Sequence, residues 1–136
     1  VSGGRKDDQM SSILTATKNT LEELARSTEV PMAGAYYGAC REKNLKEWNY
    51  FVFNRKKTDK ASNRVDYQTF YQVHVVHEDY IPEGYIQKVI ETLEAQKGAK
   101  LKATADPVEY NYTFKNNTDM VVEIATITLF HPEKRC

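Results

Sequence analysis

Apolar residues change their spacing several times along this chain, and each spacing predicts a different element. From Ser11 to Arg26 they recur every three or four residues, which is typical of an amphipathic helix. From Tyr67 to His77 they alternate with polar residues, which is typical of a strand. Between Glu83 and Gln96 the helical spacing returns. Pro82 precedes this second helix, and Gly98 follows it as a natural C-terminal stop.

Four shorter apolar runs predict the remaining strands. These runs are Met32–Cys40, Tyr50–Phe53, Glu109–Phe114 and Val121–Phe130. The last two flank Asn116-Asn117, which tolerates turn geometry, so we expect them to pair as a hairpin. The resulting element order is α-β-β-β-α-β-β. Short connections favour a mainly antiparallel sheet, and two helices packed on it give a two-layer α+β sandwich.

The alternating strand that begins at Tyr67 has two faces of different polarity. The more apolar face is expected to point into the core; it carries Tyr67, Thr69, Tyr71, Val73 and Val75. The second face is only partly polar; it carries Gln68, Phe70, Gln72, His74 and Val76. A strand with two semi-apolar faces often makes contacts on both sides.

The length of 136 residues suits one domain. We expect the domain to span residues 11–132, between a flexible N-terminal arm (1–10) and a flexible tail (133–136). Residues 1–9 lack the apolar segment of a signal peptide, and Met10 is a plausible native start. No run approaches the ~20 apolar residues of a transmembrane helix, so no membrane partner is expected.

Charge is balanced overall, with 19 basic and 19 acidic side chains and a formal net charge of zero. This balance argues against a dedicated nucleic-acid binder, which usually carries a basic excess. The two cysteines, Cys40 and Cys136, are too few for a disulfide framework and are interpreted as free thiols in a reducing compartment.

One segment nevertheless concentrates positive charge. Asn54–Asp66 is predicted to be a long polar loop at the tip of a hairpin, and such loops are usually functional or disordered. Its cations are the candidate interaction residues: Arg55, Lys56, Lys57, Lys60 and Arg64. Two interpretations remain open. The loop contacts an acidic or nucleic-acid partner, or it is a solvated, mobile tip.

The chain carries no recognisable catalytic motif, such as a Gly-rich phosphate loop. A metal-like group surrounds the end of the long strand, with His74, His77, Glu78 and Asp79 close in sequence. Because residues three apart on a strand point to opposite faces, His74 and His77 cannot converge on one ion. We therefore predict no metal, no cofactor, no catalytic residue and no enzymatic activity.

Element order and strand patterns together resemble a known family. The relevant segments are the alternating strand YQTFYQVHVV, the acidic link and helix HEDYIPEGYIQKVIETLE, and the final strand VVEIATITLF. From Met10 to Pro132 the layout resembles the tail-terminator and tail-completion proteins of long-tailed, siphovirus-type bacteriophages and prophages. The likeness is one of pattern and length.

This resemblance implies a structural role. Such proteins form a ring, commonly a hexamer, that caps the tail tube, stops its polymerisation and provides the surface for head–tail joining. The implied partners are further copies of the chain, the tail tube protein and a head-completion or connector protein, with DNA passing transiently through the ring. The implied location is the tail or neck of the virion, assembled in the bacterial cytoplasm. The alternatives are another head–tail connector or tail component of similar fold, or a small nucleic-acid-binding domain or enzyme.

Overall fold

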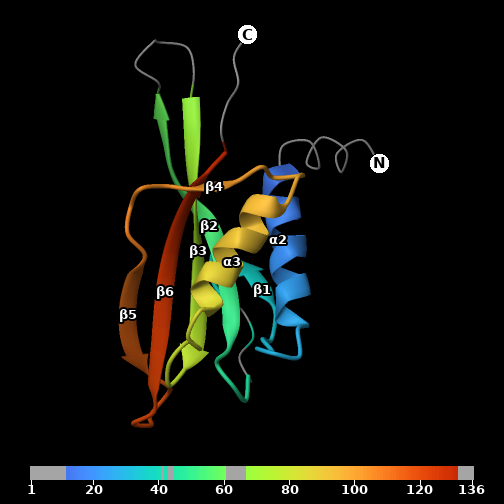
Figure 1. The fold of residues 1–136 in the computed structure, drawn as a ribbon. Coiled ribbons are helices and arrows are strands. Elements are labelled where there is room, and N and C mark those ends of the chain that lie inside the picture. The colour runs from blue at the N-terminus through green and yellow to red at the C-terminus, as the bar shows by residue number, and fades with distance from the viewer. Residues whose placement is uncertain (1–11, 41, 43–44, 61–66, 132–136) are drawn as a thin grey trace.

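Two helices and the strands of one sheet form two layers in the computed structural model of this chain (Figure 1). The structure describes residues 12–40, 42, 45–60 and 67–131. The predicted N-terminal arm (1–10) and C-terminal tail (133–136) lie outside these residues. The elements are α2 (Ser12–Ala25), β1 (Ala35–Tyr37), β2 (Tyr50–Lys60), β3 (Tyr67–Glu78), α3 (Tyr85–Ala95), β4 (Lys102–Ala103), β5 (Glu109–Phe114) and β6 (Val121–Phe130).

The six described strands follow the order β1-β2-β3-β6-β4, and β5 also pairs with β6. Only the β1–β2 pair is parallel among them, and the other pairs are antiparallel. The predicted two-layer α+β sandwich and its order α-β-β-β-α-β-β are confirmed, with the two-residue β4 as an addition. The predicted hairpin of β5 and β6 is also confirmed, from Glu109↔Thr126 to Phe114↔Val121.

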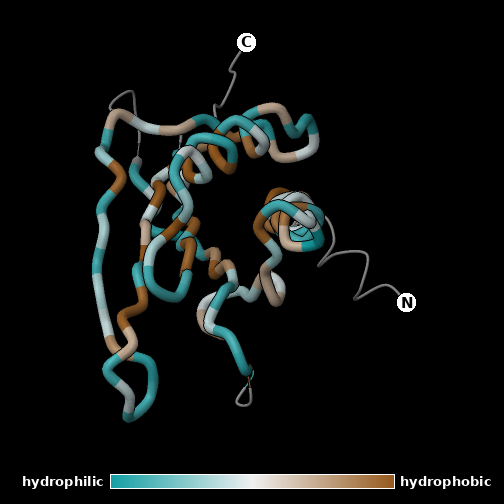
Figure 2. Tube along the Cα trace, turned by 60° about the horizontal axis from the view of Figure 1, so that its bottom comes forward, coloured by the Kyte–Doolittle hydropathy of each residue, from teal (hydrophilic) through white to brown (hydrophobic). Residues whose placement is uncertain are grey.

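The core lies between the helices and one face of the sheet (Figure 2). Its largest fully buried side chains include Leu21 of α2, Phe51 of β2 and Leu93 of α3. Burying such a side chain contributes roughly 1.5–3 kcal/mol. The core face predicted for β3 is confirmed at Tyr71, Val73 and Val75, which belong to this cluster: register aligns the three with Leu129, Ile127 and Ala125 of β6.

Each helix buries one stripe, as its spacing predicted. In α3, Tyr85, Val89 and Leu93 recur every four residues and are buried. In α2, two buried threonines lie among the apolar residues, and their hydroxyls donate to the backbone one turn earlier. Thr17 Oγ1 lies 2.8 Å from the Ile13 carbonyl oxygen, and Thr20 is bonded in the same way. These two hydroxyls are thus satisfied within the helix, whereas the buried hydroxyl of Tyr85 has no hydrogen-bond partner among the described residues.

Two predicted boundaries are wrong, for physical reasons. The expected loop Asn54–Asp66 is strand as far as Lys60, because the backbone ladder with β3 continues to Lys60↔Tyr67. Charged side chains are tolerated there since both sheet faces reach water beyond the core. The expected strand Met32–Cys40 shortens to β1 (Ala35–Tyr37); its C-terminal end is set by Gly38, which adopts φ 82° and turns the chain out of the sheet.

Candidate interaction surfaces

The long strands β2 and β3 extend past the rest of the sheet as a two-stranded projection (Figure 1). We call Arg55–Lys60 of β2 and Tyr67–Tyr71 of β3 the basic arm. Arg55 and Lys57 lie at its base, beside Tyr71 and Phe70 of β3, which still pair with β6, and the arm passes the end of β6 beyond them. Pairing of β2 with β1 ends at Phe53, so no other described strand pairs with the outer edge of the arm. A bulge between Arg55 and Lys57 interrupts the register, and bulges re-aim the side chains next to them.

Three of the five predicted cations can be placed on this arm. Arg55, Lys56 and Lys57 are all exposed. Lys57 Nζ lies 3.1 Å from Asp59 and 4.9 Å from the centre of the Phe70 ring, and Lys56 Nζ lies 3.7 Å from Asp106. Exposed ion pairs of this kind contribute about 0–1 kcal/mol, so they can exchange their partners readily. These cations are therefore available to another molecule.

The remaining two predicted cations cannot be placed in the same way. Lys60 ends β2, but its side chain lies outside the described residues, as does all of Arg64. Among the described residues, the choice between a contact segment and a solvated tip therefore depends on Arg55, Lys56 and Lys57 of β2. Residues 61–66 of the predicted loop lie outside the described part of the chain.

A polar ladder crosses the sheet on the face away from the helices. His74 of β3 contacts Asn54 of β2 through Nε2 and Thr126 of β6 through Nδ1, both at 3.0 Å. Burial lowers the pKa of His74, which favours the neutral ring. Because the Asn54 Nδ2 group donates to Gln72, the Asn54 Oδ1 atom faces His74 as an acceptor. His74 Nε2–H then donates to Asn54, and Nδ1 accepts from the Thr126 hydroxyl.

The metal-like group at the end of β3 forms a structural clasp instead. The Glu78 carboxylate forms an ion pair with the Lys115 ammonium at 2.5 Å and accepts a hydrogen bond from the backbone N–H of Trp48 at 2.7 Å. It therefore joins the end of β3, the chain before β2 and the β5–β6 turn. His77 Nδ1 lies 2.8 Å from the Glu78 carbonyl oxygen. The described residues contain no group of three or more His, Cys, Asp or Glu side chains placed to hold a metal ion.

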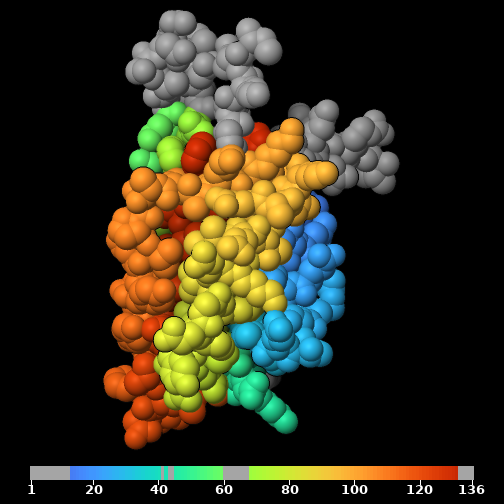
Figure 3. Space-filling view, viewed as in Figure 1, coloured from blue at the N-terminus to red at the C-terminus, as the bar shows by residue number. Residues whose placement is uncertain are grey.

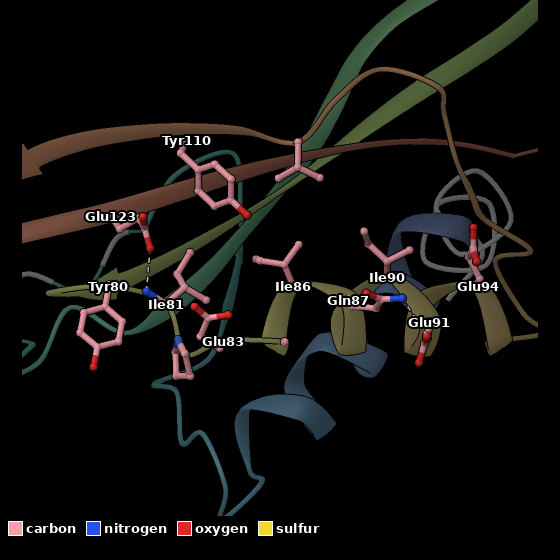
Figure 4. Close-up of a pocket in the computed structure, with 13 residues that line it drawn as sticks. Tyr80, Ile81, Glu83, Ile86, Gln87, Ile90, Glu91, Glu94, Tyr110 and Glu123 are labelled. Carbon is pink, nitrogen blue, oxygen red and sulfur yellow. Dashed lines mark hydrogen bonds between the residues drawn. The ribbon is translucent and has the colours of Figure 1, made fainter.

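A groove of about 810 Å³ separates α3 from β5, and side chains of both elements line it (Figures 3 and 4). Its lining includes the apolar side chains of Ile81, Ile86, Ile90 and Val108. The described lining contains no lysine or arginine. It does contain four glutamates, which are Glu83, Glu91, Glu94 and Glu123. Glu91 and Glu94 lie at helical spacing, which is typical of a solvated helix face, so the sequence pattern does not reveal this groove.

Two of the four groove carboxylates are held by the fold, and two are more open. Glu123 accepts the Ile81 backbone N–H and the Tyr112 hydroxyl, both at 2.7 Å. The hydrogen bond from the Tyr112 hydroxyl to the Glu123 carboxylate raises the pKa of Tyr112. Glu94 accepts the backbone N–H of Ala103 at 2.9 Å. Glu83, just before α3, and Glu91, within α3, are exposed and line the groove.

Strand β5 borders the groove and presents aromatic rings to solvent. Tyr110, Tyr112 and Phe114 are 48%, 61% and 63% exposed. Among the described strands β5 pairs only with β6, so its other edge offers unpaired backbone groups. Exposed aromatic residues and open strand edges are typical of contact surfaces. The alternation of Tyr110, Tyr112 and Phe114 was visible in the sequence, but not which side of the molecule it faces.

Comparisons with models of known protein families and with curated proteins returned no match for this chain. None of the helices in the described part is long and apolar enough to span a membrane. A functional hypothesis therefore depends on the surfaces described above and on the order of the elements.

Proposed function

We propose that this chain is a structural assembly protein of long-tailed bacteriophages or prophages. It caps the tail tube as a ring of identical copies, commonly six in the proteins that it resembles. The ring stops tube polymerisation and offers the surface that joins the head connector. Its partners are copies of itself, the tail tube protein and a head-completion protein, and its place is the tail or neck of the virion.

The observation that carries this proposal is the pairing of two contact surfaces on one small α+β domain. The basic arm projects from one end of the sheet, and an acidic groove with an exposed aromatic edge lies between α3 and β5. Surfaces of opposite charge at different places on one subunit suit head-to-tail contacts, which close into rings when the rotation allows. The element order supports the same assignment through its resemblance to tail terminators.

Deletion of the gene in a phage that encodes this chain tests the proposal. We expect over-long tails without heads by negative-stain electron microscopy, because tube growth would lack its cap. Expression of the wild-type chain from a plasmid should restore tails of uniform length. Tails of normal length that fail to join heads would contradict a terminator and favour another connector. Normal, infectious particles would contradict both.

Nucleic-acid binding is the second candidate, favoured by the exposed cations of the arm. Phosphate contacts make DNA affinity fall steeply with salt. Titration of labelled duplex DNA at two salt concentrations therefore separates the candidates. We expect only weak binding, since the rest of the chain balances the charge of the arm. Tight and salt-sensitive binding would replace the assembly proposal with a nucleic-acid-binding one.

A further inference from the structure

The basic arm and the groove carry opposite charges, although the net charge of the chain is zero. Arg55, Lys56 and Lys57 project from the arm, whereas four glutamates and no cation line the described groove. Glu83 and Glu91 are exposed there. Two surfaces of opposite sign on one molecule attract each other across copies, and such complementarity fixes register and partner choice.

Within one copy the arm is directed away from the groove. Its ladder runs continuously from Tyr50↔Val76 to Lys60↔Tyr67 and follows the strand direction out of the sheet (Figure 1). The groove lies beside the body of the sheet, between α3 and β5 (Figure 3). Along β3, Phe70 of the arm and His77, which pairs with the groove residue Glu123, are separated by about 23 Å of strand. At the near end of the groove, β3 and β6 lie between Arg55 and Ala103, whose backbone N–H binds the groove residue Glu94. A second copy faces no such restriction.

The shapes of the two surfaces also match. The outer edge of β2 pairs with no described strand beyond Phe53, and the edge of β5 beside the groove is likewise open. An extended strand can therefore lie along β5 and add backbone hydrogen bonds to the charge contacts. Tyr110 is half-exposed at the groove, and aromatic residues next to arginine are typical of the centre of an interface.

We propose that the basic arm of one copy docks in the α3–β5 groove of the next copy. This inference rests on the proposed function, because it supplies the contact from which the ring is built. The arm provides Arg55, which pairs with Tyr71 on the helix-facing side of the sheet, and the groove provides Glu83 and Glu91. Lys57 pairs with Phe70 on the opposite face and adds to the positive charge of the arm. Each copy contacts one neighbour through its basic arm and the other neighbour through its groove, so the contact is heterologous. In a closed ring of identical subunits, every arm and every groove is then occupied.

Charge reversal on each surface tests the contact by sedimentation velocity at low salt. The arm variant carries Arg55→Glu and Lys57→Glu, and the groove variant carries Glu83→Lys and Glu91→Lys. We expect each variant alone to associate at least about tenfold more weakly than wild type, since like charges then face each other. An equimolar mixture of the two variants should recover association, because every arm then meets a groove of opposite charge.

Matched controls reverse exposed charges on other surfaces. Lys18→Glu with Arg26→Glu controls the arm variant, and Glu23→Lys with Glu47→Lys controls the groove variant; all four positions are exposed. We expect both controls to associate like wild type. Thermal unfolding followed by circular dichroism should show that every variant is folded, because no substituted side chain belongs to the core.

A photoreactive residue in place of Arg55 gives an independent measurement. We expect its crosslink to reach residues 80–94 of another copy, and a crosslink confined to any other segment would overturn the docking. Reversal variants that assemble like wild type, or a mixture that fails to recover, would also overturn it. A wild-type chain that stays monomeric at every concentration would reject this contact, whereas tail length in the deletion phage would still decide the proposed function separately.

Discussion

At the scale of single residues, polar side chains of β3 hold neighbouring strands and turns in place. His74, His77 and Glu78 are close in sequence, yet each has a different structural partner. His74 bridges β2 and β6 on the face away from the helices, whereas Glu78 closes a clasp with Lys115. Alternation along a strand separates such neighbours. Their polar atoms join strands and turns of the described fold.

Glu78 gives a pH-dependent prediction. Burial alone would raise the pKa of its carboxyl, but the hydrogen bonds from Lys115 and Trp48 and the nearby positive charge lower it overall from the ordinary value of 4.5. A carboxylate with a lowered pKa in the fold stabilises it fully above that ordinary value. The contribution is lost as pH falls through the lowered pKa.

We expect Glu78→Gln to lower the free energy of unfolding by about 1–2 kcal/mol at neutral pH, because the Lys115 ammonium loses its charged partner. The difference from wild type should shrink as pH falls below 4.5. Urea unfolding at a series of pH values measures it. Glu23→Gln on the exposed face of α2 is the control and should show almost no difference at any pH. A Glu78→Gln effect that stays constant with pH would contradict the clasp.

At the scale of elements, the β2–β3 pair differs most from expectation. A run of Arg55, Lys56 and Lys57 indicates a loop by composition, because charged residues are less common in strands. The ladder nevertheless continues through them, since Thr58 and Thr69 pair and their hydroxyls lie 2.9 Å apart. The consequence is an ordered basic arm, which can hold its cations at fixed positions toward a partner.

Alanine substitution of the three arm cations separates contact from folding. We expect Arg55→Ala, Lys56→Ala and Lys57→Ala together to change the free energy of unfolding by only about 0.5 kcal/mol, because exposed substitutions rarely cost more. Self-association, measured by light scattering, should weaken.

The matched control replaces one arginine and two lysines elsewhere, at Lys18, Arg26 and Lys46, all of which are exposed. This control should leave the free energy of unfolding and the self-association unchanged. If the arm variant associated as strongly as wild type, the arm would have no role in assembly. A large loss of stability would instead mean that these side chains support the ladder.

At the scale of the whole molecule, charge is balanced in number but separated in space. The sum of zero hides a positive projection and a groove lined by four glutamates. The proposed head-to-tail contact uses this separation of charge, because complementary surfaces fix register and partner choice. The net charge of zero therefore does not indicate a partner, whereas the positions of the charges define two surfaces of opposite sign.

Ionic strength should consequently control association. Raising the salt concentration from about 0.1 M to 1 M shortens the screening length from roughly 10 Å to 3 Å, so we expect self-association of the wild-type chain to weaken by at least about tenfold. Sedimentation velocity at several salt concentrations measures this dependence. The unfolding temperature of the monomer serves as the control and should change little. Association that strengthens with salt would indicate a mainly apolar interface and contradict the charge argument.

The sequence by itself determined the elements and their layers. Period-four stripes such as Tyr85, Val89 and Leu93 can bury only one helix face, and the alternation through Tyr71, Val73 and Val75 can bury only one sheet face. Burial of these two faces against each other leaves a two-layer sandwich as the simple solution. Local periodicity carried this information, so no long-range contact had to be known.

Only the tertiary structure decided where the surfaces lie. The groove combines α3, the chain before it, β5 and β6, whose residues lie far apart in sequence, and no local pattern shows that Glu83, Glu91 and Glu123 share one lining. The extension of β2 to Lys60 depended on backbone pairing with β3, although the charged residues of β2 favour a loop at this position. Contact surfaces arise from such long-range packing, and for this chain packing defined both the arm and the groove.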